Sequence, residues 1–563
     1  MAQPITRTPT SAPHSEPPRA RRLGRLLLTT IVLPILLGLA IVLVLAMTPW
    51  GNERVRRLLV SQANGRMNGA LDVGTLRGNL FTNATLTDVR LLDSARRPLF
   101  NARRVQVSYA LWPALQGRVV IRSLVLDTPV VVLDKQPAAR WNFQSLMRPS
   151  TTPKDTSQHG VPPELADITV HHGRMIYRRP WIPDSTLTPA RRDSAIAVAL
   201  DDRARRRTER VAGGFQRVLD YHDLDARLST VRLAHAGEPT AVNIASLSML
   251  AEPYRPPAID VRSLVGTLYA SKDSLWWRGA RMALPSSKVF GDGTIAFHKL
   301  GFRLDLTGAP VALADLRWLN PKLPESGGGR LRYTMRVHGD TSAFALADAD
   351  LRYRDASIVG HGSVRRIASK GTKSELLIDG ADLTVAKLST AIVHELAPSL
   401  PIRRTGTLDG HLVVSGAPSA LALNADVRFD DAAAGRSHLL ARGGVGLAGG
   451  ISARELSVQL RPLQLATLSG AGLRLPIGGV LSGDATVNGA TSDGWRVRGD
   501  LTHVERGARS RVTGTGSYGA RDKRIVADAQ LAPLSLATVG RFAPAAQLRG
   551  AVTGRVHAEG TTR

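Results

Sequence analysis

Alternation of apolar and polar residues with a period of two is the feature that most constrains the fold of this chain. Between Trp495 and Thr502 the odd positions are mainly apolar and the even positions are polar, as in a β-strand with one buried face. The same alternation recurs at 105–111, 302–306, 349–354 and 421–429. We therefore expect strands rather than helices from Trp50 onward, in a mainly β protein with an elongated antiparallel sheet and a few short helices.

The apolar positions of these strands define a candidate binding surface. We predict that a lipid groove is lined by Val105, Val107, Tyr109, Leu423, Val427, Phe429, Trp495, Val497 and Leu501. A sandwich of two sheets with a filled core would show the same alternation. The sequence therefore leaves open whether the apolar face is open or filled.

Four pairs of glycines, each ten residues apart, indicate an internal repeat. The pairs are Gly329 and Gly339, Gly406 and Gly416, Gly479 and Gly489, and Gly550 and Gly560. The first members are 77, 73 and 71 residues apart, and three of them follow a Leu-Pro dipeptide and a short apolar segment of helical character. We predict repeats of several strands plus a short helix over residues 311–563. The last repeat is expected to be incomplete and to leave a strand edge open.

Composition divides the remainder of the chain into further segments. We expect a disordered cytoplasmic tail at 1–25, a transmembrane helix at 26–47, an N-terminal β-domain at 48–147, a linker at 148–163 and a β-rich middle region at 164–310. The tail is rich in proline, and the linker combines Pro, Ser, Thr and Gly. The middle region contains a basic insertion around residues 191–216.

The run from Leu26 to Met47 is uncharged over 22 residues, which is long enough to cross a bilayer as a helix. We predict a membrane anchor that includes Leu26, Ile31, Leu36, Ile41 and Met47, with Trp50 as an interfacial aromatic residue. A cleaved signal peptide would have a shorter apolar region and a small-residue cleavage site. We expect the N-terminus in the cytoplasm and the body in the periplasm.

Charge and cysteine content exclude several classes of protein. The chain has no Cys, which removes disulfide frameworks and thiolate metal sites. Its net charge of +28 comes largely from single Arg residues spread through the alternating segments, so we do not expect a nucleic-acid partner. The cluster from Arg203 to Arg210 is compatible with a solvated helix or insertion loop, or with a surface for anionic headgroups.

No catalytic or cofactor site is predicted. The sequence from Gly514 to Gly519 has the spacing of a dinucleotide fingerprint, but a strand-like segment follows it instead of a helix, so we interpret it as a β-turn. His171 and His172 are adjacent and have no carboxylate cluster nearby, so we expect surface or turn histidines. We expect neither enzymatic activity nor a cofactor.

Residues 69–93 resemble the opening of bacterial AsmA-like and TamB-like envelope proteins. Segments 101–109 and 115–133 and the Trp141-Asn142 dipeptide continue this resemblance, and the repeats from Val311 onward match it less closely. The resemblance implies a β-groove, or β-taco, that lets phospholipids pass between the inner and outer membranes. It also implies a contribution to outer-membrane biogenesis, with a β-barrel assembly protein as a further partner. The alternative is a scaffold for outer-membrane protein insertion or secretion that transports no lipid. The resemblance does not extend to the large C-terminal β-domain of that family.

Overall fold

The computed structural model describes residues 48–79, 81–110, 120–146, 164–233, 238–297, 301–367, 375–396, 404–470, 476–541 and 547–561. The chain forms two compact units. Among the described residues, those from 48 to 133 and from 140 to 146 make the first unit, while Asp134–Ala139 and those from 164 to 561 make the second. No helix in the described ranges is long and apolar enough to span a membrane. The predicted tail, anchor (26–47) and linker (148–163) lie outside the described residues.

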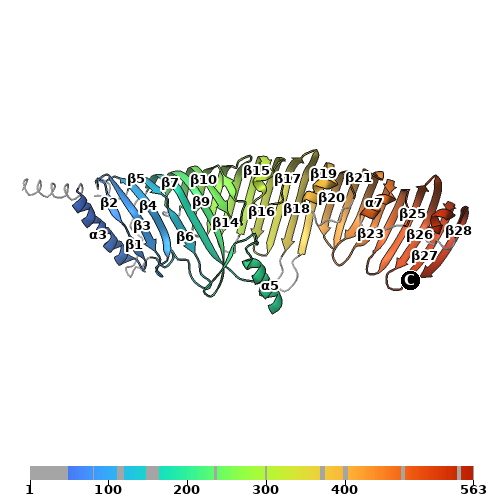
Figure 1. The fold of residues 1–563 in the computed structure, drawn as a ribbon, viewed down its shortest axis with the longest axis horizontal. Coiled ribbons are helices and arrows are strands. Elements are labelled where there is room, and N and C mark those ends of the chain that lie inside the picture. Colours follow the sequence, from blue (N-terminus) through green and yellow to red (C-terminus); the bar gives the residue numbers. More distant parts are fainter. Residues whose placement is uncertain are drawn as a thin grey trace, which may run out of the picture. The chain divides into compact units, whose positions relative to one another are not determined.

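The first unit combines one helix with a small antiparallel sheet (Figure 1). Its elements are α3 (Pro49–Arg66), β1 (Ala70–Asp72), β2 (Thr75–Arg77), β3 (Asn83–Leu92), β4 (Pro98–Tyr109), β5 (Ile121–Asp127) and β6 (Val130–Asp134). Our expectation of strands from Trp50 onward is wrong for residues 50–66, which belong to this helix. Thr48 caps this helix by accepting a hydrogen bond from the Gly51 N–H at 3.2 Å, Pro49 occupies the first turn, and Glu53 pairs with Arg56 and Arg57.

Helix α3 packs on the apolar core of the first unit. Val73, Val89, Ala102 and Val105 form this buried cluster, and Val60 of the helix contacts it. Arg56 donates to the Val73 carbonyl at 2.8 Å, and the Asn64 side chain exchanges two hydrogen bonds with the Leu71 backbone. These bonds hold the helix against β1 and the residues between β1 and β2.

The second unit is a repetitive antiparallel sheet with few short helices, as the alternation predicts. Its first strands are β7 (Glu164–Trp181), β8 (Thr208–Val211), β9 (Gly214–Arg232), β10 (Thr240–Glu252), β11 (Ile259–Val261), β12 (Ser263–Ala270), β13 (Ser274–Ala283), β14 (Lys288–Ala296) and β15 (Gly301–Ala312). They are followed by β16 (Gly328–His338), β17 (Thr341–Tyr353), β18 (Ala356–Ile367), β19 (Glu375–Ser389), β20 (Gly406–Ala417), β21 (Ala420–Asp431) and β22 (Gly435–Gly446). The last are β23 (Ser452–Gln464), β24 (Val480–Ala490), β25 (Gly494–Glu505), β26 (Ala508–Gly519), β27 (Arg524–Ser535) and β28 (Ala551–Thr561).

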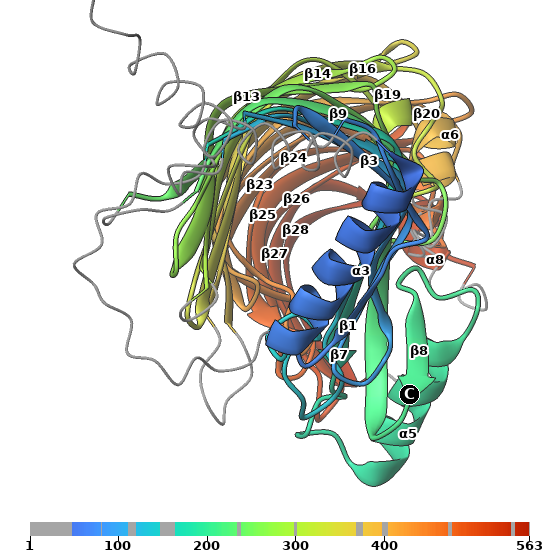
Figure 2. The same cartoon turned by 90° about the vertical axis from the view of Figure 1, so that its left-hand side faces the viewer.

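From β12 onward each strand pairs with the next one in the chain. Figure 2 shows that the strands of this unit are curved rather than flat. The order differs near its start, where β9 pairs with β7 on one side and with β10 and β8 on the other. The predicted basic insertion contains helix α5 (Pro189–Leu200) and strand β8, and ends in β9.

Short helices divide this sheet into groups of four strands. η2 (Ala314–Leu316), α6 (Thr390–Leu396), α7 (Leu465–Gly470) and α8 (Leu536–Gly540) precede β16, β20, β24 and β28 respectively. Each predicted glycine pair lies at or next to the two ends of one of these four strands: Gly329 and Gly339 at β16, Gly406 and Gly416 at β20, Gly479 and Gly489 at β24, and Gly550 and Gly560 at β28. The repeating element of the structure is therefore four strands plus a short helix.

The junctions between groups share two hydrogen bonds that the sequence did not reveal. The N–H groups of Leu313, Leu465 and Leu536 donate to the carbonyls of Gly327, Gly479 and Gly550, each 14 residues ahead, at 2.9–3.0 Å. A buried serine hydroxyl accepts a hydrogen bond from the N–H of the residue that precedes each of these leucines. Ser287 Oγ accepts from Ala312, Ser437 Oγ from Gln464, and Ser510 Oγ from Ser535. These bonds satisfy backbone donors where the chain leaves the sheet.

Candidate functional site

Strand register assigns every residue of the second unit's sheet to one of two faces, because directly opposed residues of paired strands point the same way. One residue on each strand from β15 to β28 belongs to a single row of such partners. In order, the apolar row consists of Val311, Gly329, Leu351, Ile358, Val385, Gly410, Val427, Leu439, Leu460, Gly483, Leu501, Val512, Leu531 and Gly554. Every member is apolar or glycine. We call the face that carries this row the apolar face.

A second row on the same face has the same character. It consists of Ala349, Gly360, Leu383, Leu412, Ala425, Ala441, Val458, Ala485, Gly499, Gly514, Ala529 and Val556. Neither row contains a charged residue. The apolar surface is therefore continuous from strand to strand across all four repeat junctions from β15 to β28.

Several large side chains of this face are accessible to solvent. Phe344 is 37% exposed, Leu346 44%, Ile525 41% and Val556 38%, whereas a residue inside a filled core is almost fully buried. Other members of the two rows are buried, among them Ala425 at 8%, Leu460 at 8% and Leu531 at 5%. Near the edge, Ile392 of α6 packs on Tyr353 and Ala356. In the described part of the second unit, the apolar face is therefore only partly covered by other side chains.

The predicted lining residues fall into two groups. Leu423, Val427 and Phe429 of β21 and Trp495, Val497 and Leu501 of β25 all lie on the apolar face of the second unit and are half-buried. Val105 of β4 belongs instead to the buried cluster of the first unit, with only 8% of its surface exposed. Val107 packs against that cluster, and burial raises the pKa of Tyr109.

Several residues of the apolar face were not singled out by sequence reasoning. Tyr333 and Met335 of β16 oppose Leu346 and Phe344 of β17, and Trp277 of β13 lies against Gly293 of β14. The alternation of Leu331, Tyr333, Met335 and Val337 is a signal that could have identified β16.

The residues from Gly514 to Gly519 form part of strand β26, so our interpretation of them as a β-turn is wrong. Gly514 belongs to the second row of the apolar face, and Gly516 lies on the same face opposite Val497. A side chain at Gly514 would overlap the backbone of Asp528 on β27. Gly514 therefore serves the close approach of β26 and β27, whereas Gly516 has open space around it.

The opposite face of the sheet carries charged residues that pair between strands. Arg332 and Asp305 form a bidentate pair at 2.9–3.0 Å, and His438 lies 2.8 Å from Asp426. Exposed apolar side chains such as Phe290 and Val359 occur there singly. This polar face has the composition expected of a solvated surface.

Among the described residues of the second unit, Asp500 on the polar face has the carboxyl group whose pKa is shifted most. Arg511 donates to both its oxygens at 2.9 and 2.6 Å, and the Thr513 hydroxyl donates at 2.9 Å. These bonds, that of Arg511 foremost, lower the pKa of Asp500 to about 2.

Replacing Arg511 by Gln is expected to raise the pKa of Asp500 toward its ordinary value of 3.8. Since folding lowers this pKa, the carboxylate stabilises the fold above about pH 3.8, and that contribution disappears as the pH falls through about 2. NMR titration of the Asp500 carboxyl carbon in both proteins measures the shift. An unchanged pKa in the variant would show that Arg511 does not hold the carboxylate.

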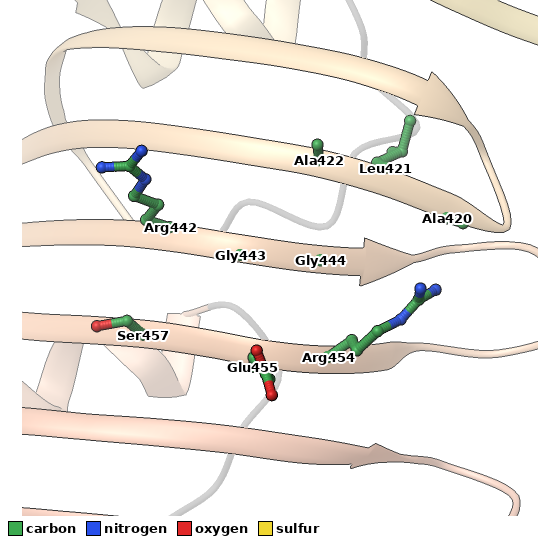
Figure 3. A pocket seen from close by; sticks show the side chains of 9 residues that line it. All are labelled: Ala420, Leu421, Ala422, Arg442, Gly443, Gly444, Arg454, Glu455 and Ser457. Carbon is green, nitrogen blue, oxygen red and sulfur yellow. The ribbon is translucent and has the colours of Figure 1, made fainter.

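Shallow depressions occur on the polar face where strands are irregular. In Figure 3, Gly443 and Gly444 lie between Arg442 and Arg454, next to Glu455. Glu455 is a bulge residue with φ +46°, and its N–H donates to the Asn488 side chain at 2.6 Å. Such bulges increase the local twist of a strand pair. The depression is open.

The remaining residues singled out from the sequence are two histidines and the predicted membrane-anchor residues. His171 and His172 are exposed on β7, at a bulge where His172 has φ +51°. The described ranges hold no group of three or more His, Asp or Glu side chains placed to bind a metal. Trp50 is 59% exposed on α3 with Arg54 over its ring, whereas Leu26, Ile31, Leu36, Ile41 and Met47 lie outside the described residues.

Comparison with known proteins identifies no relative. No protein-family model, curated protein or solved structure matches the chain. Functional inference therefore depends on the geometry of the apolar face and on the residues themselves.

Proposed function

We propose that this chain is a membrane-anchored periplasmic protein that carries phospholipids between the inner and outer membranes and so contributes to outer-membrane biogenesis. The observation that supports this proposal best is the uninterrupted and partly exposed apolar face from β15 to β28. A surface of this extent on a soluble protein normally has an apolar partner. The uncharged run at 26–47 supports the membrane anchor.

The dimensions of the face suit acyl chains. One leaflet contributes about half of a hydrocarbon core about 30 Å thick, so one acyl chain spans about three or four strands at a spacing of about 4.8 Å. This length matches one repeat of four strands. An acyl chain could pass from one repeat to the next without leaving an apolar surface, because the rows contain no charged residue.

The resemblance to AsmA-like and TamB-like proteins points to the same function, which requires no catalysis. The alternative of a scaffold for outer-membrane protein insertion, without lipid transport, needs a partner that covers the apolar face permanently. We favour lipid transport because acyl chains can cover an apolar face of any length without specific complementarity.

Site-specific photo-crosslinking in cells tests the proposal. A photoreactive amino acid at Val427 or Trp495 on the apolar face is expected to yield phospholipid adducts. The neighbouring positions Arg428 and Arg496 on the polar face are the matched controls, and we expect at least about tenfold fewer adducts there, since polar side chains do not retain acyl chains. Capture of a barrel-assembly protein without lipid at Val427 and Trp495 would instead favour the scaffold.

A further inference from the structure

The apolar face carries a cluster of basic and aromatic residues near the start of the second unit, where the pairings from β9 to β15 place both on one face. On β7 and β9 its apolar side chains include Met175, opposite Tyr221, and Tyr177, opposite Leu219. The next two pairs along the same face are Arg179 with Arg217 and Trp181 with Phe215. Strand β8 extends both rows, because Thr208 opposes Arg217 and Arg210 opposes Phe215.

Contacts with aromatic rings position the guanidinium groups of this cluster. Arg217 lies over Trp181 at 5.3 Å and Arg210 over Phe215 at 5.1 Å. Arg206 lies over the ring of Tyr254 at 5.7 Å. Tyr254 belongs to a loop that Arg205 holds in place by donating a hydrogen bond to the Arg255 carbonyl at 2.6 Å. These cation–π contacts order the side chains without neutralising their charge.

The nearby carboxylates are already paired with other arginines. Glu209 pairs with Arg207, Asp220 with Arg174, and Asp202 with Arg255. No ion pair joins Arg179, Arg206 or Arg217 to an acidic side chain among the described residues. Burial lowers the pKa of Arg217, and the charges of Arg206 and Arg179 lower it further.

Two polar atoms in the cluster are buried and have no hydrogen-bond partner within the described ranges. They are the hydroxyl of Thr208, whose residue is only 6% exposed, and Nε of Arg217, the residue directly opposite it. A buried donor without a partner destabilises a fold. Together with the three guanidinium groups that have no acidic partner, these atoms suit an anionic acceptor with several oxygens.

We propose that Arg179, Arg206, Thr208, Arg210 and Arg217 form a binding site for the phosphate ester of an anionic amphiphile whose acyl chains lie on the adjacent apolar face. Arginine forks match phosphate oxygens in geometry and charge. This inference rests on the proposed function, because it uses the apolar face as the acyl site. It adds selection of the headgroup at one position on that face.

Two photoactivatable probes with the same acyl chain test the site on the full chain in a non-ionic detergent. One is a lysophosphatidate, and the other is the monoacylglycerol that lacks its phosphate. We expect at least about tenfold greater capture of the phosphate probe on β7 and β9, since each charge-assisted bond contributes strongly. Arg179→Gln with Arg217→Gln should remove this preference and leave capture of the neutral probe unchanged.

The matched control is Arg303→Gln with Arg336→Gln, because these two arginines also oppose each other across neighbouring strands but lie exposed on the polar face. This control should keep the full preference. The double variant Arg179→Lys with Arg217→Lys retains both charges and should keep part of the preference for the phosphate probe. This variant tests the site even if the glutamine variant folds poorly.

Three outcomes would overturn the inference, and they are distinguishable. Equal capture of both probes by the unmodified chain would exclude headgroup selection and leave the apolar face as a lipid site. If inorganic phosphate competes with the phosphate probe as effectively as unlabelled lysophosphatidate does, the cluster is a free-phosphate site unrelated to amphiphiles. Capture of neither probe would contradict the proposed function itself.

Discussion

Replacing Phe344 and Leu346 together by glutamate is expected to block lipid movement at β17 while the protein remains folded. Both side chains lie on the apolar face and are more than one-third exposed, so water can hydrate the new carboxylates in the lipid-free protein. An acyl chain that crosses β17 would have to desolvate two charges, which costs several kcal/mol. Lipid should therefore stop at this strand.

Crosslinking on both sides of β17 measures the block. Photoreactive residues at Leu304 on β15 and at Val427 on β21 report lipid on the two sides. We expect capture to persist at one position and to fall at least about tenfold at the other, and the depleted side identifies the direction of transport. Ala343→Glu with Ala345→Glu on the polar face of the same strand is the control and should leave both signals intact. Unchanged capture at Leu304 and Val427 in the Phe344 and Leu346 variant would contradict a continuous path.

The sequence predicts correctly which side chains of β21 and β25 lie on the apolar face, because these strands contain no bulge. The pairings of β21 with β20 and β22, and of β25 with β24 and β26, run without a register shift. Alternation with a period of two therefore assigns Leu423, Val427 and Leu501 to the same side as the apolar row. Hydrophobic pattern is sufficient where the pleat is unbroken.

Strand β17 shows where the same reasoning fails. Leu346 and Leu351 differ by an odd number of positions, so simple alternation assigns them to opposite faces. A register shift between Leu346 and Ala349, with Asp348 at φ +50°, places both on the apolar face. A bulge at a non-glycine residue leaves no reliable signature in one sequence. Phe344 and Leu346 were missed for this reason.

The basic and aromatic cluster depends on contacts that are distant in sequence. Arg179 and Arg217 become neighbours only through the pairing of β7 with β9, which passes two register shifts before it reaches them. The sequence reveals the cluster from Arg203 to Arg210 as a basic segment, yet it cannot specify that Arg206 and Arg210 lie close to the end of the apolar face. Helix α3 was missed because its capping and ion pairs outweigh a weak apolar pattern.

Replacing Gly483 by alanine is expected to destabilise the sheet around β24 strongly. Gly483 has φ +130°, a conformation that costs other residues about 1–3 kcal/mol. A Cβ there would also overlap the backbone carbonyl of Asp500 on β25, and this carbonyl cannot rotate away because it belongs to the sheet. Gly516→Ala is the matched control on the same face, since it has open space around it, and we expect a change within about 1 kcal/mol.

Native-state hydrogen exchange resolves this effect along the chain. A repeat protein transmits local destabilisation mainly to adjacent elements, so Gly483→Ala should accelerate exchange in β23 to β26 and leave β15 to β18 unchanged. Equal exchange in the two variants would show that Gly483 is not required for close strand approach. Since Gly483 belongs to the apolar row between Leu460 and Leu501, the variant should also lose lipid capture at Trp495 but retain it at Val427 if lipid passes along the row in chain order.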